Sequence, residues 1–162
     1  MKYLIDTNGN YYEAEKNTTN ATEVPKRPSV HHSWQGGEWV LDQAAFMADA
    51  QTTTRAEIIA KRDAAITGGF SYLGKTIDSD RDSVMSITGA GVAALAAKAA
   101  GLPYSVTWTC ADDSTIVLDA DSVLGMVVTL AQFADARHAK ARPLKDAIKN
   151  AQTPDDLGKV VW

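Results

Sequence analysis

Short β-forming segments alternate with polar turns in the first part of the chain. Residues 3–5 and 11–13 lie on either side of Asn8-Gly9. This dipeptide favours the left-handed backbone that a two-residue hairpin turn requires, and the flanking residues include tyrosine and isoleucine, which favour strands. We therefore predict a β-hairpin at the start of the chain.

A loop and a second hairpin are predicted next. Residues 16–29 are polar and contain two prolines, a composition that is typical of an extended loop. Trp34 and Trp39 then lie on either side of Gly36-Gly37. Two glycines between aromatic residues predict a second β-hairpin.

Residues 42–66 follow a helical pattern. Thr54 and Glu57 form a capping-box sequence just before an apolar run, so we expect a helix to begin near Thr54. Residues 42–51 then form either a separate helix or a helix that runs into the next one. The glycines at positions 68 and 69 are expected to end this element.

The next part of the chain predicts two further hairpins with a helix between them. The hairpins are expected at residues 70–77 and 104–119. A capping sequence that begins at Ser79 predicts a helix that reaches Ala100 and stops before Gly101.

Two helices are expected after the last hairpin. Asp119 or Asp121 is predicted to cap a long helix that continues to Asn150. Pro143 is expected to kink or divide this helix, because proline lacks the amide hydrogen that the helix needs. Thr153, followed by a proline and two acidic residues, predicts the start of a short final helix.

This order of elements predicts an α+β fold with a small β-hairpin module before a larger mixed domain, in which hairpins pack with two or more helices. We expect an N-terminal β-module at residues 1–41, a linker or helix at residues 42–54, and an α+β domain at residues 55–162.

Composition and charge indicate a soluble globular protein. The net charge is −4 and the hydrophobic fraction is 45%, which predicts neither a nucleic-acid partner nor a membrane-surface partner. The single cysteine, Cys110, excludes an internal disulfide and a cysteine-based zinc site. We expect neither a signal peptide nor a membrane span, since the most apolar segment, residues 123–136, is too short.

One motif raises the question of nucleotide binding. Residues 69–76, GFSYLGKT, match the phosphate-loop pattern G-x-x-x-x-G-K-[ST], and Asp119 follows an apolar strand. A phosphate loop requires a strand before it and a helix after it. Here a helix precedes the motif and a β-like segment follows Lys75, so we favour a β-hairpin.

Two adjacent histidines and two nearby tryptophans are further candidates. His31 and His32 fall on opposite faces of a strand, so we do not expect them to chelate one metal ion. Trp34 and Trp39 form either an exposed aromatic platform for a partner or a cross-strand pair that closes a small hairpin. Both interpretations stay open at this point.

No catalytic set is apparent, and we expect neither enzymatic activity nor a cofactor. Cys110 lies in a predicted strand and is expected to be buried and inert. The aspartates of residues 78–82 and 112–113 lie at turns and helix starts, where acids serve local structure. The basic residues between Arg137 and Lys149 are expected to form a solvated helix face.

Three segments resemble a known family. They read RDAAITGGFSYLGKTIDSDRDSVMSITG, TWTCADDSTIVLDADSV and RHAKARPLKDAIKNAQTPDDL. The matching positions are Arg62, Asp63, Gly69, Tyr72, Gly74, Asp78, Asp80, Trp108, Asp112, Asp113, Leu118, Asp121, Leu144, Lys145 and Ile148. Over residues 55–160 the chain resembles a domain of unknown function found in tail proteins of bacteriophages and prophages.

The first part of the chain resembles the front of phage tail-fibre assembly proteins. The similarity rests on a P-x-R-P sequence at residues 25–28 and a W-x-x-G-x-W sequence at residues 34–39. No enzymatic activity is associated with these motifs. The resemblance also implies that the GKT sequence belongs to the hairpin pattern of the domain.

These resemblances imply a bacteriophage tail-associated protein without catalytic activity. We expect a tail-fibre assembly chaperone or fibre-binding accessory protein that works in the host cytoplasm and binds a tail-fibre or other tail protein. The candidate contact residues are Tyr3, Tyr11, Tyr12, Trp34 and Trp39.

Two alternatives are retained. The first is a minor structural component of the virion tail or tail fibre, which would form a homo-oligomer through its C-terminal helices. The second is a nucleotide-binding protein.

Overall fold

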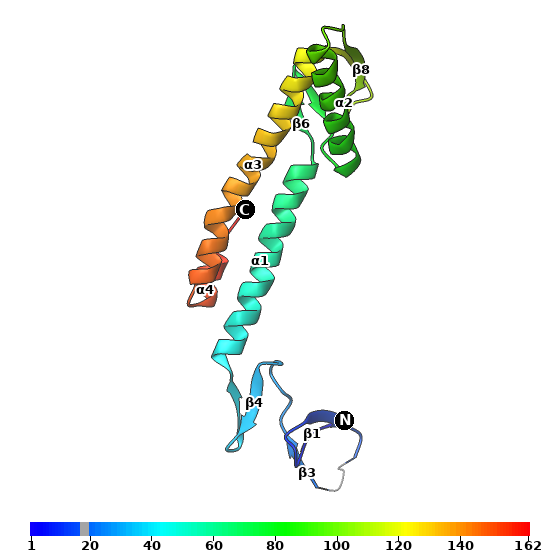
Figure 1. The fold of residues 1–162 in the computed structure, drawn as a ribbon. Coiled ribbons are helices and arrows are strands. Elements are labelled where there is room, and N and C mark those ends of the chain that lie inside the picture. The colour runs from blue at the N-terminus through cyan, green and yellow to red at the C-terminus, as the bar shows by residue number, and fades with distance from the viewer. Residues whose placement is uncertain (17–19) are drawn as a thin grey trace. The chain divides into compact units, whose positions relative to one another are not determined.

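The computed structural model describes residues 1–16 and 20–162 and confirms the α+β fold (Figure 1). The chain divides into two compact units, residues 1–50 and residues 51–162. The boundary falls within the first helix, and each unit is described by itself below.

The N-terminal unit is built from two small antiparallel sheets. The first has the strand order β2-β1-β3 and the second is the pair β4-β5. Their strands are β1 (Lys2–Asp6), β2 (Tyr11–Ala14), β3 (Ala21–Val24), β4 (His32–Gln35) and β5 (Glu38–Leu41). Both predicted hairpins are confirmed, although residues 7–10 separate β1 from β2, so the first turn is longer than the two-residue turn that Asn8-Gly9 suggests. The turn between β4 and β5 requires glycine, because Gly36 and Gly37 have φ angles of +58° and +96°.

Strand β3 corrects the prediction of an extended loop over residues 16–29. Residues 17–19 of that segment lie outside the described residues, but Ala21–Val24 pairs antiparallel with β1 and places Val24 opposite Tyr3. Val24 is buried. The local sequence is polar, and the strand forms because it pairs with the second edge of β1, a contact that local composition does not reveal.

The first helix, α1 (Gln43–Thr67), is continuous, which confirms the alternative that residues 42–51 form a helix running into the next one, whereas the predicted separate start near Thr54 is wrong. Asp42 lies at its beginning, where Oδ1 accepts a 2.9 Å hydrogen bond from the Ala45 amide and the carbonyl oxygen accepts one from Phe46 N. The alanine-rich segment before Thr54 has high helix propensity, so helix continues through the capping-box sequence. The glycines after Thr67 end the helix as predicted, with Gly69 at φ +87°.

The C-terminal unit contains two hairpins and three further helices. Its elements are β6 (Phe70–Tyr72), β7 (Lys75–Ile77), α2 (Arg81–Ala99), β8 (Ser105–Thr109), β9 (Thr115–Asp119), α3 (Ala120–Asn150) and α4 (Pro154–Gly158). Both predicted hairpins and the final helix are confirmed. Helix α4 begins at Thr153 with a capping box that Asp156 completes.

The starts of α2 and α3 are set by aspartates. Asp80, one residue later than predicted, caps α2 by accepting hydrogen bonds from the amides of Asp82 and Ser83. Ser79 is instead buried, where its hydroxyl accepts a 2.9 Å hydrogen bond from Gly69 N and donates one to a carbonyl at the end of α1. Asp119 caps α3.

Pro143 lies inside α3 and does not divide it, so of the two predicted outcomes the division is wrong and the kink stays a prediction. A proline within a helix costs about 3 kcal/mol, because one backbone hydrogen bond is lost and its ring crowds the preceding turn. The segment after it stays helical, and Ala141 and Ile148 on either side of the proline are buried. Burial of these residues offsets part of that cost.

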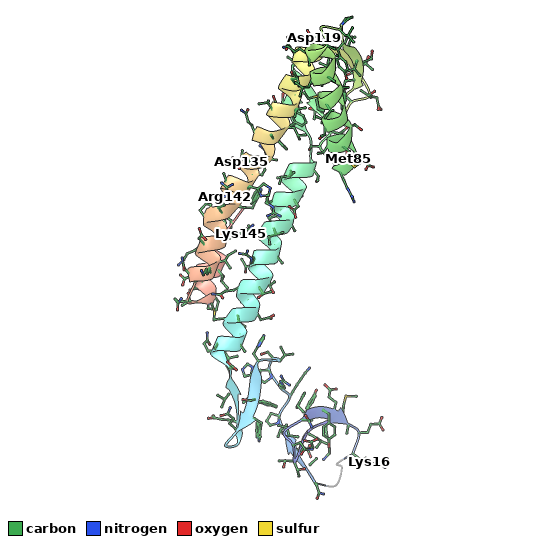
Figure 2. The ribbon with its side chains drawn as sticks, in the orientation of Figure 1. Lys16, Met85, Asp119, Asp135, Arg142 and Lys145 are labelled. Atoms are coloured by element: carbon green, nitrogen blue, oxygen red, sulfur yellow. The ribbon has the colours of Figure 1, made fainter. Side chains whose placement is uncertain are left out.

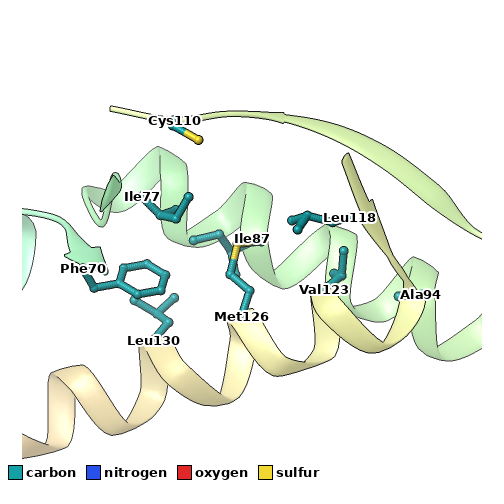
Figure 3. Close-up of a cluster of buried hydrophobic side chains, with 9 residues drawn as sticks. All are labelled: Phe70, Ile77, Ile87, Ala94, Cys110, Leu118, Val123, Met126 and Leu130. Carbon is teal, nitrogen blue, oxygen red and sulfur yellow. The ribbon is translucent and has the colours of Figure 1, made fainter. Parts of the chain in front are cut away.

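The main hydrophobic core of the C-terminal unit lies between α2, α3 and the two hairpins (Figure 3). It consists of Phe70, Ile77, Ile87, Ala94, Cys110, Leu118, Val123, Met126 and Leu130. Cys110 is buried as predicted, although it follows β8 instead of lying in it.

Helix α1 runs beside α3, with Gln51 Nε2 donating a 3.1 Å hydrogen bond to the carbonyl oxygen of Ala151. Within the described part of the chain, no helix has the length and apolar character needed to cross a membrane.

Candidate functional site

Four of the five aromatic residues predicted to contact a partner form one continuous row in the N-terminal unit. The rings of Tyr3 and Tyr11 are nearly parallel, with centroids 6.1 Å apart. Tyr11 meets Trp39 edge to face at 5.5 Å, and Trp39 meets Trp34 in the same manner at 5.2 Å. We call these four residues the aromatic ladder. All four side chains are half-buried.

Strand register explains how the ladder forms. Ile5 is paired with Tyr11 and Tyr3 with Glu13, so Tyr3 and Tyr11 are diagonal neighbours on one face of the first sheet. Trp34 lies directly opposite Trp39 in the second sheet. The predicted cross-strand tryptophan pair is therefore present, and it continues into a larger aromatic surface that includes the first sheet.

Polar contacts fix the ladder where the two sheets meet. Trp39 Nε1 donates a 3.0 Å hydrogen bond to the carbonyl oxygen of Pro25. The hydroxyl oxygen of Tyr11 accepts a 3.2 Å hydrogen bond from the Arg27 amide. The guanidinium carbon of Arg27 also lies 5.8 Å from the centre of the Tyr11 ring, within the range of a cation–π interaction. These contacts hold the rings in defined orientations.

Tyr12 does not join the ladder. Successive side chains of a strand point to opposite faces of the sheet, and Tyr12 is paired with Leu4, which is fully buried. Tyr12 therefore belongs to the face of the first sheet opposite the one that carries Tyr3 and Tyr11. The structure separates this candidate from the other four.

Three of the four ladder residues line an open groove with a volume of about 490 Å³. Tyr11, Trp34 and Trp39 contribute aromatic walls. The polar groups along the groove come from Arg27, His31, His32, Ser33 and Asp42. Arg27 and His31 were not among the predicted contact residues, although Arg27 is the arginine of the P-x-R-P sequence. An apolar wall with a few polar groups is the usual composition of a recognition groove.

The two histidines beside the groove have different partners. His31 Nε2 lies 3.4 Å from Asp49 Oδ2, and the His31 ring meets the Phe46 ring edge to face. His32 Nδ1 forms a 2.8 Å hydrogen bond with Ser29 Oγ. Over residues 1–16 and 20–162, the structure contains no cluster of three or more metal-ligating side chains.

The turn that supports the groove is held by Asp6. Its carboxylate accepts hydrogen bonds from the side chain and amide of Asn10 and from the amide of Asn8. The Asn10 contacts, followed by the other amides of the turn, lower the pKa of Asp6 below its ordinary value. Gly9, which lines the groove, has a φ angle of +84° in this turn.

The GFSYLGKT segment is a hairpin, as predicted from its context. Its turn residues Leu73 and Gly74 have φ angles of +48° and +77°, and Tyr72 pairs with Lys75 across the two strands. A phosphate loop instead leads from a strand into a helix whose N-terminus faces the phosphates. In this chain the lysine begins strand β7.

Lys75 connects this hairpin to the β8–β9 turn. Lys75 Nζ donates a 2.7 Å hydrogen bond to Ser114 Oγ and lies 3.3 Å from Asp112 Oδ2. The Ala111 amide also donates a 2.9 Å hydrogen bond to the carbonyl oxygen of Thr76. Hydrogen bonds from Ser114, with a smaller contribution from Lys75, lower the pKa of Asp112 from 3.8 to about 2.

The basic residues of α3 take part in local contacts. Arg142 Nη2 donates a 3.0 Å hydrogen bond to Asp135 Oδ1 (Figure 2). The Arg137 guanidinium lies 3.5 Å from the centre of the Phe133 ring, and the Lys140 ammonium lies 4.6 Å from the centre of the Trp162 ring. Arg137, Lys140 and Trp162 line one small pocket together with Ala65 and Ala136.

Comparison with protein families identifies the larger part of the chain. A domain of unknown function, DUF4376, matches residues 49–160. The chain belongs to the DUF4376 family. Neither a curated protein nor a solved structure shows a match to it.

The DUF4376 match includes the contacts of Lys75 but does not include the aromatic ladder. The Lys75 contacts and the core of the C-terminal unit lie inside residues 49–160. The aromatic ladder lies entirely before residue 49, on the N-terminal unit. The candidate binding surface is thus an addition to the DUF4376 domain in this chain, and its properties follow from its own residues.

Proposed function

We propose that this DUF4376 protein is a bacteriophage tail-associated protein that binds a tail-fibre protein through the aromatic ladder. It then acts as a tail-fibre assembly chaperone or as a fibre-binding accessory protein. The observation that carries this proposal is the continuous row of half-buried rings from Tyr3 to Trp34 beside an open groove. The resemblance of both parts of the chain to phage tail and tail-fibre assembly proteins supports the choice of partner.

The chemistry of the ladder suits protein binding. Tyrosine and tryptophan supply large contact areas and lose little conformational entropy when they bind, so they are frequent at the energetic centres of interfaces. The hydrogen bonds of Tyr11 and Trp39 already fix their rings. A partner therefore meets a surface that needs little further ordering.

The first sheet offers a second element of recognition. Strands β2 and β3 both lie at the edges of the β2-β1-β3 sheet, and β2 carries Tyr11. An extended segment of a client can add to such an edge through backbone hydrogen bonds while its side chains contact the aromatic rings. This mode would let the protein hold a fibre segment that has not yet been incorporated into its final fold.

Quantitative mass spectrometry of purified phage particles and of the lysate that produced them tests this role. An assembly chaperone is expected in the lysate at much higher abundance than in the particles, and it should co-purify with the fibre protein. Presence in particles at a fixed stoichiometry would instead make the protein a tail component. Absence from both samples would contradict the tail-associated function.

One observation favours the alternative of a minor structural component in the tail or tail fibre. Helix α2 exposes several large apolar side chains, among them Met85, Val92 and Leu95. A surface of this kind is typical of a protein that assembles with other chains. The particle stoichiometry measured in the same experiment decides between the two roles.

A further inference from the structure

Helix α2 carries a regular row of exposed residues on the side that does not face the core. The helix contains no charged residue between Asp82 and Lys98. Met85, Val92 and Leu95 are 64%, 65% and 59% exposed. We call the row the α2 seam, and it comprises Arg81, Met85, Thr88, Val92, Leu95 and Ala99. All of these residues are exposed, and Met85 is labelled in Figure 2.

The spacing of the α2 seam is that of a coiled-coil interface. Its members follow one another at alternating intervals of four and three residues, which is the heptad pattern of paired helices. The core does not require this row, because α2 already buries Ile87, Gly91 and Ala94 on another face. A helix with one buried face normally presents polar residues to water on the opposite side. The α2 seam departs from that rule at Met85, Val92 and Leu95.

We infer that the α2 seam binds the same seam of a second copy of this chain, with the two helices antiparallel about a two-fold axis. In an antiparallel pair centred on residue 90, positions at equal distances from the centre lie opposite each other. The resulting pairs are Met85 with the partner's Leu95, Thr88 with the partner's Val92, and Arg81 with the partner's Ala99. Every large apolar residue of the seam then meets a residue of the partner's seam.

Charge selects the antiparallel orientation. Arg81 lies on the seam at the start of α2, is exposed, and makes no ion pair within the described residues. A parallel pair would place the two arginines opposite each other, which is unfavourable. The antiparallel pair separates the two arginines and places each Arg81 beside the C-terminal end of the other helix, where the helix dipole is negative and the charge of Lys98 is paired with Asp121. Each α2 helix therefore contributes a positive side chain at its start and a negative dipole at its end, and each meets the opposite charge of the other helix.

The middle of the helix permits close approach. Gly89 flanks the seam near the two-fold axis, and a Cβ atom added there would meet nothing within 4 Å in the single chain. The glycine leaves the backbone accessible at the point where the two helices would lie closest. Because the interface consists of one helix from each copy, we expect dimerisation that depends on protein concentration.

Sedimentation velocity over micromolar to near-millimolar concentrations tests the dimer with the full chain. The wild type is expected to shift from monomer to dimer, and Val92→Glu is expected to remain monomeric while keeping its helical circular dichroism. Val117→Glu is the matched control, because Val117 is 73% exposed on β9, outside α2. It is expected to dimerise like the wild type. A wild type that stays monomeric, or a dimer that persists in Val92→Glu, would overturn the inference.

Disulfide trapping tests the orientation. Chains with Met85→Cys are mixed with differently tagged chains with Leu95→Cys and exposed to a mild oxidant. Cys110 is 2% exposed, so it does not compete with the introduced thiols. The antiparallel pair predicts a covalent dimer between the two kinds of chain and little within either kind alone. Trapping of Met85→Cys chains with one another, without the mixed dimer, would overturn the antiparallel arrangement. This inference is independent of tail-fibre binding, which the N-terminal unit mediates.

Discussion

Lys75 Nζ lies 2.7 Å from Ser114 Oγ and joins the first hairpin of the C-terminal unit to the turn of the second. The lysine that completes the G-x-x-x-x-G-K-[ST] pattern is thus engaged by a serine 39 residues away in the sequence. In a phosphate loop the same lysine would point toward bound phosphates from a loop that opens a helix. The contact explains the presence of a lysine at this position without reference to a nucleotide.

Substitution of Lys75 is expected to change the stability of the fold and not the binding of a nucleotide. Lys75→Ala should lower the unfolding temperature slightly, because the contacts with Ser114 and Asp112 are partly exposed and such contacts contribute little. Addition of ATP or GTP with magnesium should leave the unfolding temperature of the wild type unchanged. A magnesium-dependent increase that Lys75→Ala abolishes would contradict the structural role assigned here.

The Asp112 carboxylate is expected to make stability depend on pH in the acidic range. Its pKa is lowered from 3.8 to about 2 in the folded chain, so the ionised form is favoured by folding. The stabilisation is complete above the unfolded-state value and is lost as the pH falls from 3.8 towards 2. The difference in unfolding temperature between the wild type and Asp112→Asn should therefore shrink over this interval.

The neighbouring Asp113 provides the control for that measurement. Asp113→Asn removes a carboxylate from the same turn without removing the one that accepts the hydrogen bonds of Ser114. Thermal unfolding followed by circular dichroism at several pH values compares the three proteins. If the unfolding temperatures of Asp112→Asn and Asp113→Asn depended on pH in the same way, the Ser114 contacts would not stabilise the charged form of Asp112.

Two glycines of α2 are expected to respond in opposite directions to substitution by alanine. A Cβ atom at Gly91 would lie 2.7 Å from Val127 Cγ2 of α3, whereas one at Gly89 would meet nothing within 4 Å. Alanine gains up to about 1 kcal/mol over glycine inside a helix. Overpacking in a core costs about 1–3 kcal/mol.

Gly89→Ala should therefore raise the free energy of unfolding and Gly91→Ala should lower it. Chemical denaturation of both variants measures the two changes, and it is carried out at low protein concentration so that association through α2 does not contribute. If Gly91→Ala proved as stable as Gly89→Ala, Val127 would have adjusted at no cost, and close packing of α2 against α3 would not depend on the glycine.

The sequence predicted the elements whose signals are local. The turn glycines at positions 36, 37 and 74 and the cap at Thr153 determine structure within a few residues, and each predicted element is present. Strand β3 was missed because its pairing with β1 joins segments far apart in the chain. The start of α1 was misplaced because the capping-box sequence at Thr54 competes with helix-forming residues on its N-terminal side.

The candidate site was predicted in part for the same reason. The pairing of Trp34 with Trp39 follows from the intervening glycines, but the contact of Tyr11 with Trp39 joins two separate sheets. No periodicity in the sequence indicates that contact. The separation of Tyr12 from the ladder follows from strand alternation once the register with β1 is known.

The aromatic ladder makes a specific prediction about partner binding, and Tyr3 and Tyr12 offer a matched pair. Both are half-buried tyrosines of the first sheet, but they lie on opposite faces and only Tyr3 belongs to the ladder. Substitution of an aromatic residue that contributes strongly to an interface commonly weakens binding by a factor of about 10 to 100. Tyr3→Ala is expected to do so, and Tyr12→Ala is not.

The most direct test of the proposed function is titration calorimetry with the tail-fibre protein encoded by the same phage or prophage genome. The wild type and Tyr12→Ala should bind this protein with similar dissociation constants, and Tyr3→Ala should bind it at least about tenfold more weakly. Circular dichroism of each variant confirms that the fold is retained. Absence of binding by the wild type, or equal weakening by both substitutions, would contradict tail-fibre recognition through the aromatic ladder.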